Sequence, residues 1–339
     1  MKDSRIKFAI IGCGHIGKRH GEMIRRNPEG ELVALCDMAP EATLGLEAFG
    51  NVPFYNSPAA MLAAHPEAEV VSVCSPNGLH ATHTMAALET GKHVVCEKPM
   101  ALKKSDCEAL ISKALQVNKN IFCVMQNRYS PPSLWIKEVV HKKILGEIFM
   151  VELNCYWNRD DRYYKKGGWK GSSELDGGTL FTQFSHFIDI MFWLFGDIKD
   201  IQAKFNNFTH KQTIQFEDSG IVSFNFLNGG MGSINYSTSV WDKNLESSIA
   251  VIGSKGSVKI GGQYMDKVEY CHIKDYEMPV LAPTNPANDY GAYKGSASNH
   301  HYIIANVIDT LKGRTTITTN AIEGLKVVDI IERIYALKK

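Results

Sequence analysis

The residues of this 339-residue chain that could do chemistry gather first in two short motifs. One is Gly12-Cys13-Gly14-His15-Ile16-Gly17, which follows an apolar run, and the other is Glu97-Lys98-Pro99, which ends another such run. A glycine-rich turn between a strand and a helix lets backbone amides approach a pyrophosphate at the N-terminus of the helix. We therefore expect a dinucleotide site whose cofactor contacts include Gly12, Gly14, His15, Ile16 and Gly17.

Asp37 stands twenty residues after Gly17, at the end of the next apolar run. A carboxylate there can accept hydrogen bonds from the ribose hydroxyls, and its charge would repel a 2′-phosphate. An ordinary turn carboxylate is the alternative interpretation. The motif context favours a cofactor contact, and it predicts NAD rather than NADP.

Lys98 ends a predicted strand beside a glutamate and before a proline. Because proline biases the preceding residue toward an extended conformation, the lysine side chain is held in a defined direction. Near a bound cation in a partly dry pocket its ammonium form is disfavoured, which brings the amine into range for proton transfer. A surface lysine paired with Glu97 is the alternative. We expect Lys98 to be catalytic and to contact cofactor and substrate.

The elements that would position these residues are short apolar runs alternating with helical stretches. Apolar runs without strict alternation suit strands buried on both faces, and helices between them supply parallel crossovers. The sequence therefore predicts an α/β fold with an N-terminal doubly wound Rossmann domain over residues 1–126. Its strands are expected at Ile6 to Ile11, Leu32 to Cys36, Val70 to Cys74, His93 to Cys96 and Ile121 to Val124.

Polar residues or glycines follow all five predicted strands, with one intervening residue, Met125, after the last of them. In a doubly wound sheet, ligands bind beyond the carboxyl ends of the strands, so these positions are expected to surround the cofactor. Besides the glycine turn and Asp37, the predicted cofactor contacts there are Ser75, Asn77, His80, Glu97 and Gln126.

Longer alternating segments begin after residue 127, among them Glu147 to Trp157, Thr213 to Leu227 and Gly232 to Val240. Asn228-Gly229 has the turn chemistry of a hairpin. The pattern predicts a C-terminal α+β domain over residues 127–339, built on a large, mostly antiparallel open sheet. Helices are expected at Phe184 to Phe195, at about His300 to Leu311 and at Ala321 to Leu337, the last able to pack back on the first domain.

One face of that open sheet has no later element in the chain to cover it. Association of this face between subunits would bury it, so we expect a homodimer or homotetramer. The domain would then serve both substrate binding and oligomerisation.

The charge and cysteine content exclude several classes of partner. With 37 basic and 36 acidic residues the net charge is +1, so no broad basic field attracts nucleic acid or a membrane surface. A small molecule is the expected partner. The start is charged and no apolar run reaches the roughly 20 residues of a membrane span, so we expect a cytoplasmic protein. The eight cysteines show no C-x-x-C spacing, and no metal is expected.

Gly12 to Gly17, Asp37, Ser75-Pro76-Asn77 with His80, and above all Glu97-Lys98-Pro99 resemble the Gfo/Idh/MocA oxidoreductase family. The segment Gly177 to Asp189 extends the resemblance into the second domain. It implies that His186 acts with Lys98 in proton transfer, whereas a buried core histidine is the alternative.

The same segment departs from the commonest family pattern, which has an aspartate four residues before the histidine. This chain has Thr182 there, and Thr182 shares a helix face with His186 and could contact substrate, but it cannot act as a base. Proton transfer therefore falls to His186 and Lys98. Gln183 and Asp189 are expected to orient substrate or imidazole.

Tyr156 to Gly171 is dense in aromatic residues and arginines, which suits a sugar carrying anionic groups. A subunit-interface loop is the alternative, since interfaces are enriched in the same residues. We expect Arg159 and Tyr163 to bind substrate. The resemblance implies that Trp169 and Lys170, usually Trp-Arg in the family, lie near the cofactor.

These features are most similar to the subgroup that oxidises UDP-N-acetylglucosaminuronic acid at C3 in surface-polysaccharide synthesis. The resemblance implies that Asn299 and His300 approach the sugar nucleotide, although Asn299 could simply cap a helix, and that 2-oxoglutarate could reoxidise the cofactor. Alternatives are a cyclitol or simple-sugar dehydrogenase, an NAD-retaining glycosidase and a non-catalytic NAD-sensing regulator.

Overall fold

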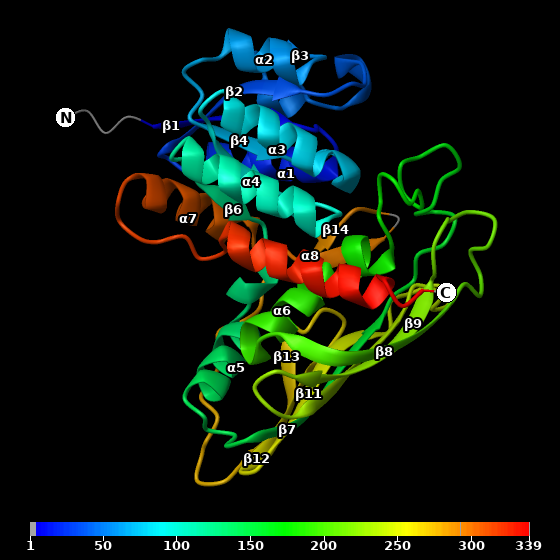
Figure 1. Cartoon of the computed structure of the whole chain (residues 1–339). Coiled ribbons are helices and arrows are strands. Elements are labelled where there is room, and N and C mark those ends of the chain that lie inside the picture. The colour runs from blue at the N-terminus through cyan, green and yellow to red at the C-terminus, as the bar shows by residue number, and fades with distance from the viewer. Residues whose placement is uncertain (1–4, 292, 339) are drawn as a thin grey trace. The chain divides into compact units, whose positions relative to one another are not determined.

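The computed structural model describes residues 5–291 and 293–338 (Figure 1). The chain divides into two compact units. The first contains the chain up to Val124 together with His300–Val328, and the second contains Met125–Asn299 together with the residues from Asp329 onward. The division falls inside the last helix, and it assigns the preceding helix to the first unit.

The first unit is built on a six-stranded parallel sheet with the order β3-β2-β1-β4-β5-β6. The five predicted strands are all present, which confirms the doubly wound fold. The sixth strand, β3, has only two residues, too few to show a period in the sequence. The strands are β1 (Ile6–Ile11), β2 (Gly30–Cys36), β3 (Phe54–Tyr55), β4 (Val70–Val73), β5 (His93–Cys96) and β6 (Ile121–Cys123).

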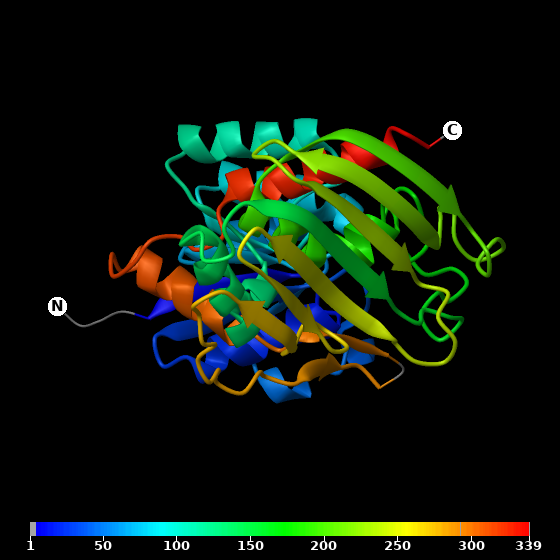
Figure 2. The same ribbon diagram turned by 90° about the horizontal axis from the view of Figure 1, so that it is seen from below.

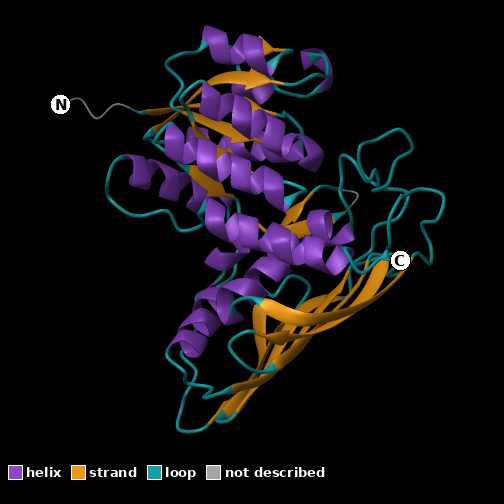
Figure 3. Cartoon of the chain, in the orientation of Figure 1, coloured by secondary structure: helices purple, strands orange, loops and turns teal. Residues whose placement is uncertain are grey.

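Helices connect and cover these strands (Figure 3). The helix α7 packs against α1 and so joins the N-terminal unit from far along the chain. The helices are α1 (His15–Arg26), α2 (Pro58–Ala64), α3 (His80–Glu89), α4 (Lys104–Gln116), α7 (His300–Leu311) and α8 (Ala321–Tyr335), with short turns η1 (Glu41–Thr43), η2 (Glu47–Phe49) and η3 (Asn77–Leu79).

The second unit is built on a seven-stranded sheet with the order β13-β12-β11-β7-β10-β9-β8, whose strands Figure 2 shows side by side. Only β7 and β10 pair in parallel, so the predicted mostly antiparallel sheet is confirmed. The strands are β7 (Ile148–Tyr156), β8 (Ile198–Asn206), β9 (Ser219–Phe226), β10 (Met231–Ser237), β11 (Glu246–Gly253), β12 (Gly256–Gly261) and β13 (Lys267–Ile273).

The remaining elements of this unit are short or lie beside the sheet. Trp157, just after β7, packs edge-on against Phe184 and Phe187, which places α6 over the sheet. The other elements are η4 (Gln126–Tyr129), α5 (Pro131–His141), the π-helical turn η5 (Leu180–Phe184), α6 (Ser185–Phe195), and the paired strands β14 (Ala287–Asp289) and β15 (Lys294–Ala297).

One face of the seven-stranded sheet is buried and the other is exposed. The register places Met150 beside both Met231 and Ile252, and all three are exposed. Their chain neighbours on the opposite face, such as Val151, are buried. The alternation read from the sequence therefore reports the two faces of this sheet correctly.

The predicted strand Thr213 to Leu227 is shorter in the structure, where β9 begins at Ser219. Asp218 explains the difference, because its carboxylate accepts hydrogen bonds from the backbone amides of Phe208 and Thr209. The chain before it is thereby drawn into an irregular loop. Periodicity alone cannot show that a side chain has replaced strand pairing.

None of the helices in the described ranges combines the length and the apolar composition needed to cross a membrane. All eight cysteines are free thiols.

Candidate active site

The glycine turn of the first unit is shaped by close backbone approaches. Gly12 has a φ of +95°, and a Cβ there would lie 2.6 Å from the backbone of Cys74. At Gly17 a Cβ would lie 1.8 Å from the carbonyl oxygen of Gly12, whereas Gly14 faces open space. Gly14 begins α1 without a side chain of its own to bond the first amides. A helix N-terminus of this kind fits the pyrophosphate of a dinucleotide.

Asp37 holds the same turn from the end of β2. Its Oδ2 accepts a hydrogen bond of 2.7 Å from the Cys13 amide, and its Oδ1 accepts one of 2.9 Å from Ala39. The carboxylate is therefore fixed beside the glycine motif, where it retains lone pairs for ribose hydroxyls. His15 is exposed at the start of α1, and Ile16 is half-buried after it.

Glu97, the residue before Lys98, is buried and bonded to protein groups. Its Oε1 lies 3.0 Å from Nε2 of His20 and 3.5 Å from Nε2 of His300. Its Oε2 accepts a hydrogen bond of 3.2 Å from the backbone amide of Lys98. Burial raises the pKa of Glu97, but the two histidines outweigh it and hold that pKa well below its usual range. Glu97 is thus an anion, and its carboxylate holds the backbone amide of Lys98.

The residue after Lys98 is also held by a buried histidine. The Lys98-Pro99 peptide is cis, and the Pro99 carbonyl oxygen lies 2.6 Å from Nδ1 of His80. Nε2 of the same ring lies 2.8 Å from the carbonyl oxygen of Ser75. Burial lowers the pKa of His80, and the two carbonyl contacts act against this. His80, Ser75 and the buried Asn77 therefore gather beside Lys98 at the end of β4.

In the second unit His186 lies on α6 and is buried. Its Nε2 is 3.2 Å from the side-chain nitrogen of Gln126. An amide N–H only donates, so the contact leaves Nε2 of His186 as an acceptor, which is the state in which imidazole can take up a proton. Asp189, one turn along α6, is paired with Arg128.

Thr182 lies in the π-helical turn that leads into α6. Its hydroxyl donates to the side-chain carboxylate of Asp176 and also lies 2.9 Å from the Asp176 carbonyl oxygen. Asp176 also accepts a hydrogen bond of 2.7 Å from the Gly171 amide. A carboxylate therefore stands against position 182 although the residue there is threonine.

Arg159 is nearly fully buried within a cage of three rings. Its guanidinium carbon lies 4.6 Å from the ring centroid of Trp157 and 5.1 Å from those of Tyr163 and Tyr293. Its Nε donates to Gln183 over 2.8 Å, and its terminal nitrogens donate to backbone carbonyls and to Asn244. Arg159 is thus bonded to protein acceptors.

Gln183 continues this network toward His186. Its amide nitrogen donates to the Tyr163 hydroxyl over 2.7 Å, while its oxygen accepts from Arg159. Three of the predicted substrate residues, Arg159, Tyr163 and Gln183, therefore form one bonded group on the chain just before His186.

Lys170 lies against the same aromatic group, beside the half-buried Trp169. Its amine is 3.8 Å from the ring centroid of Tyr163 and donates to the Tyr293 hydroxyl over 3.2 Å. Burial, followed by the charge of Arg159, lowers the pKa of Lys170 to about 8. This amine can therefore change charge near neutral pH.

Asn299 and His300 are neighbours in the sequence but belong to different units. Asn299 donates to the Gln126 carbonyl oxygen over 3.2 Å and to Ser130 over 3.1 Å. His300 instead begins α7 and meets Glu97. Sequence reasoning missed His20 and Arg128, and the signal for His20 was its place one turn after Gly17, on the buried side of α1.

The predicted residues fall into two sets. The first unit contains Gly12, Gly14, His15, Ile16, Gly17, Asp37, Ser75, Asn77, His80, Glu97, Lys98 and His300, and the second contains Gln126, Arg159, Tyr163, Trp169, Lys170, Thr182, Gln183, His186 and Asn299.

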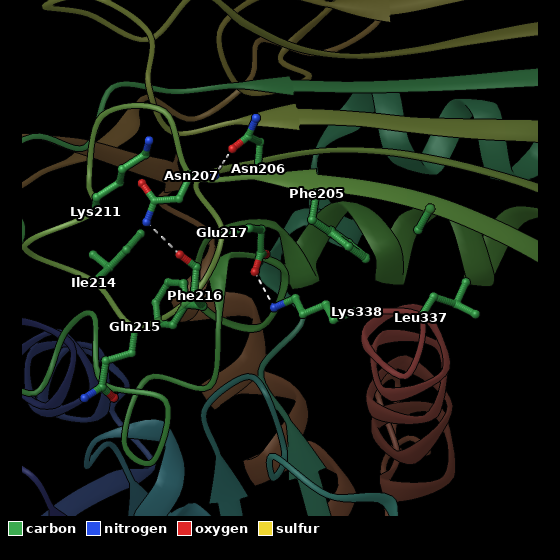
Figure 4. A pocket seen from close by; sticks show the side chains of 11 residues that line it. Phe205, Asn206, Asn207, Lys211, Ile214, Gln215, Phe216, Glu217, Leu337 and Lys338 are labelled. Atoms are coloured by element: carbon green, nitrogen blue, oxygen red, sulfur yellow. Dashed lines mark hydrogen bonds and ion pairs between the residues drawn. The ribbon is translucent and has the colours of Figure 1, made fainter.

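A separate pocket of about 720 Å³ lies in the second unit (Figure 4). Phe205 and Phe216 line it, together with Lys211 and an ion pair between Glu217 and Lys338. Tyr335 donates a hydrogen bond of 2.6 Å to Glu217. None of the predicted site residues lines this pocket.

Comparison with known proteins gives matches over both units. Residues 6–125 match the family described as oxidoreductase family, NAD-binding Rossmann fold, and residues 134–259 match the GFO/IDH/MocA C-terminal domain. Among solved structures, the WlbA dehydrogenase from Bordetella pertussis, in complex with NADH and UDP-GlcNAcA, gives a TM-score of 0.87 at 30% identity. That match covers 98% of this chain and 96% of the other.

Two relatives are named as 3-dehydrogenases, one of a glucoside and one of a glucose phosphate. The D-glucoside 3-dehydrogenase of Escherichia coli K12 is 32% identical over 250 residues, which are 68% of this chain and 70% of that protein. The glucose-6-phosphate 3-dehydrogenase of Bacillus subtilis is 26% identical over 302 residues, which are 86% of this chain and 85% of that protein.

Proposed function

Since the chain belongs to the Gfo/Idh/MocA family and is an NAD-dependent sugar dehydrogenase, we propose that it oxidises the C3 hydroxyl of a UDP-N-acetylhexosaminuronic acid. Surface-polysaccharide synthesis in the cytoplasm is the proposed setting. The observation that carries the proposal is the likeness to the WlbA dehydrogenase, which extends over nearly the whole of both chains.

Two side chains carry the proposed proton chemistry. His186 takes the proton of the sugar hydroxyl at Nε2, with that hydroxyl replacing the Gln126 amide that contacts Nε2 in this structure. The amine of Lys98 donates a hydrogen bond to the same oxygen as it becomes an alkoxide and then a carbonyl. NAD, when held by the first unit, would supply the redox chemistry as the acceptor of the hydride from the carbinol carbon.

The cofactor contacts are proposed from the geometry of each unit. The turn Gly12 to Gly17 offers amides to the pyrophosphate, and Asp37 offers oxygens to the ribose hydroxyls. Glu97 has both carboxylate oxygens in protein contacts, so its backbone is the part left to face the cofactor. The further proposed contacts are Ser75, Asn77, His80, Lys98, Gln126, Trp169 and Lys170.

Substrate recognition is proposed to fall on Thr182, Gln183, Tyr163, Asn299, Lys98 and His186. Arg159 and His300 are each about 2% exposed and lie against protein groups. We therefore propose them as supports that hold the binding residues, rather than as contacts of the sugar.

The test is incubation of the purified protein with NAD and a panel of UDP-sugars, uronic acids and simple glucosides. NADH is followed by absorbance and the products by mass. Oxidation of UDP-GlcNAcA with loss of about 2 Da is the expected result. If no NADH forms and no mass changes across the panel, even with 2-oxoglutarate present to reoxidise the cofactor, the proposal is wrong and a cyclitol dehydrogenase or a regulator is favoured.

A simple-glucoside dehydrogenase is the second candidate, favoured by the 32% identity to the Escherichia coli D-glucoside 3-dehydrogenase. Oxidation of glucosides with no response to UDP-sugars would select it. Release of an aglycone without net NADH would instead indicate an NAD-retaining glycosidase.

We also propose that the exposed face of the seven-stranded sheet associates with a second copy. Met150, Met231 and Ile252 form an apolar group on neighbouring strands, and Ile221 and Tyr270 are exposed on the same face. Burying it would stabilise a homodimer or homotetramer. Light scattering at micromolar concentration tests this, and a monomeric mass would exclude it.

A further inference from the structure

Lys98 is bracketed by buried histidines from three separate helices of the first unit. His20 lies on α1, His80 begins α3 and His300 begins α7. Each of them is at most 2% exposed. Such burial of three imidazoles around one short segment is costly unless they make specific contacts.

On the N-terminal side the contacts run through the Glu97 carboxylate. His20 and His300 face one oxygen, at 3.0 and 3.5 Å, and the other oxygen accepts the Lys98 amide. The two rings also meet edge to face with centroids 5.7 Å apart. The carboxylate cannot rotate without breaking a contact on either side, so it fixes the peptide that carries Lys98.

On the C-terminal side the contact runs through His80. Its ring lies between the carbonyl oxygens of Pro99 and Ser75, at 2.6 and 2.8 Å. The ring therefore links the residue after Lys98 to the loop that follows β4. Protein contacts therefore hold the backbone on both sides of the lysine, at the Lys98 amide and at the Pro99 carbonyl.

A bound metal is the rival explanation, because ligand atoms of His20, Glu97 and His300 all lie within 4.8 Å of one another. A metal-binding histidine ordinarily donates its second ring N–H to a carboxylate or carbonyl. Within the described part of the chain, Nδ1 of His20 and both ring nitrogens of His300 have no hydrogen-bond partner, so His300 meets Glu97 only through the ion-pair contact of 3.5 Å. Two buried N–H groups would be left unsatisfied by metal binding, whereas bare acceptor nitrogens cost less.

We propose that His20, His80 and His300 are positioning residues, which hold the backbone on both sides of Lys98 and so aim its amine. The inference rests on the catalytic role given to Lys98 in the proposed function. Their contribution is alignment: a displacement of about 1 Å at a reacting group can cost roughly 100-fold in rate.

The experiment compares His80→Gln, Glu97→Gln and Glu97→Ala with the wild-type protein, each loaded with NAD. We expect Glu97→Ala and His80→Gln each to lower kcat about 100-fold. In Glu97→Ala the KM and the Kd for NAD should change little, because only the backbone of Glu97 is proposed to face the cofactor. Glu97→Gln keeps one oxygen acceptor and should lie between wild type and Glu97→Ala. The matched control is His93→Gln, since His93 lies at the opposite end of the strand from Glu97 and its Nδ1 accepts a hydrogen bond from the Asn120 amide.

A second readout needs no turnover. Hydrogen exchange at the Lys98 amide should quicken by about tenfold or more in Glu97→Ala, because that amide loses its acceptor, and should stay slow in His93→Gln. Faster exchange in a protein that oxidises no sugar would refute the proposed function while supporting the positioning role. Wild-type kcat in both Glu97→Ala and His80→Gln would overturn the inference, as would one equivalent of zinc retained on dialysis by wild type and lost in Glu97→Ala.

Discussion

The guanidinium of Arg128 makes two parallel hydrogen bonds to the carboxylate of Asp189, from Nε to Oδ2 over 2.8 Å and from a terminal nitrogen to Oδ1 over 2.6 Å. Both side chains are about 1% exposed. Arg128 follows Gln126 in the turn η4, and Asp189 follows His186 on α6. The ion pair therefore fixes the two elements whose side chains meet at the candidate base.

We expect Asp189→Asn to lower the free energy of unfolding by about 3 kcal/mol or more, because it leaves the buried Arg128 charge without its partner. Urea unfolding measures this. Glu138→Gln is the control, since it removes an exposed ion pair with Lys142 and should cost less than about 1 kcal/mol. Equal costs for the two variants would show that burial of the Arg128 pair adds nothing.

Removal of the His186 imidazole should abolish the proposed proton transfer. We expect His186→Ala to lower kcat by about 100- to 10,000-fold. The Kd for NAD should change little, because the proposed pyrophosphate and ribose contacts, Gly12 to Gly17 and Asp37, are left intact. Steady-state kinetics and NAD titration measure the two quantities. Unimpaired turnover would remove His186 from the mechanism.

Asp37 should set the preference for NAD. In Asp37→Asn one amide oxygen remains to accept from Cys13, but the negative charge is lost. We expect the ratio of the NADP Kd to the NAD Kd to fall by about tenfold or more, because repulsion of the 2′-phosphate disappears. Asp37→Ala, which also frees the Cys13 amide, should weaken both cofactors. Tighter binding of NADP than NAD by the wild type would show that Asp37 does not discriminate.

His93 should make the first unit sensitive to acid. Burial, with the nearby charge of Lys119, lowers the pKa of His93 from 6.5 to about 4. Between these values the unfolded chain binds a proton that the folded chain does not, so stability is complete above pH 6.5 and falls as the pH drops toward 4. The stability difference between wild type and His93→Gln should change over pH 7.5 to 5, and a constant difference would contradict this assignment.

Much of the fold was predictable because the buried strands of the first unit are short apolar runs, and a polar residue or glycine follows each predicted run within two residues. The position of Asp37 follows from the same regularity. The cluster of His20, Glu97 and His300 beside Lys98 was not predictable, because these residues are far apart in sequence. The packing of α1 against α7 brings them together.

The segment Tyr156 to Gly171 shows a second limit of prediction from the sequence. Its aromatic and basic composition indicated binding residues, but composition cannot distinguish an arginine that meets a ligand from one that holds its own loop, as Arg159 does through Gln183 and backbone carbonyls. The sequence also showed that position 182 holds threonine instead of the family's aspartate. It could not show that the Asp176 carboxylate accepts a hydrogen bond from the Thr182 hydroxyl.

The Thr182 hydroxyl and the Asp176 carboxylate together constrain how this protein can be altered toward its relatives. An aspartate installed at 182 would face the Asp176 carboxylate at hydrogen-bonding distance. Two carboxylates this close repel each other when both are ionised, so the pair would retain one shared proton. Copying the commoner family residue into this chain would thus create an acid pair with a strongly elevated affinity for one proton, unless Asp176 were replaced as well.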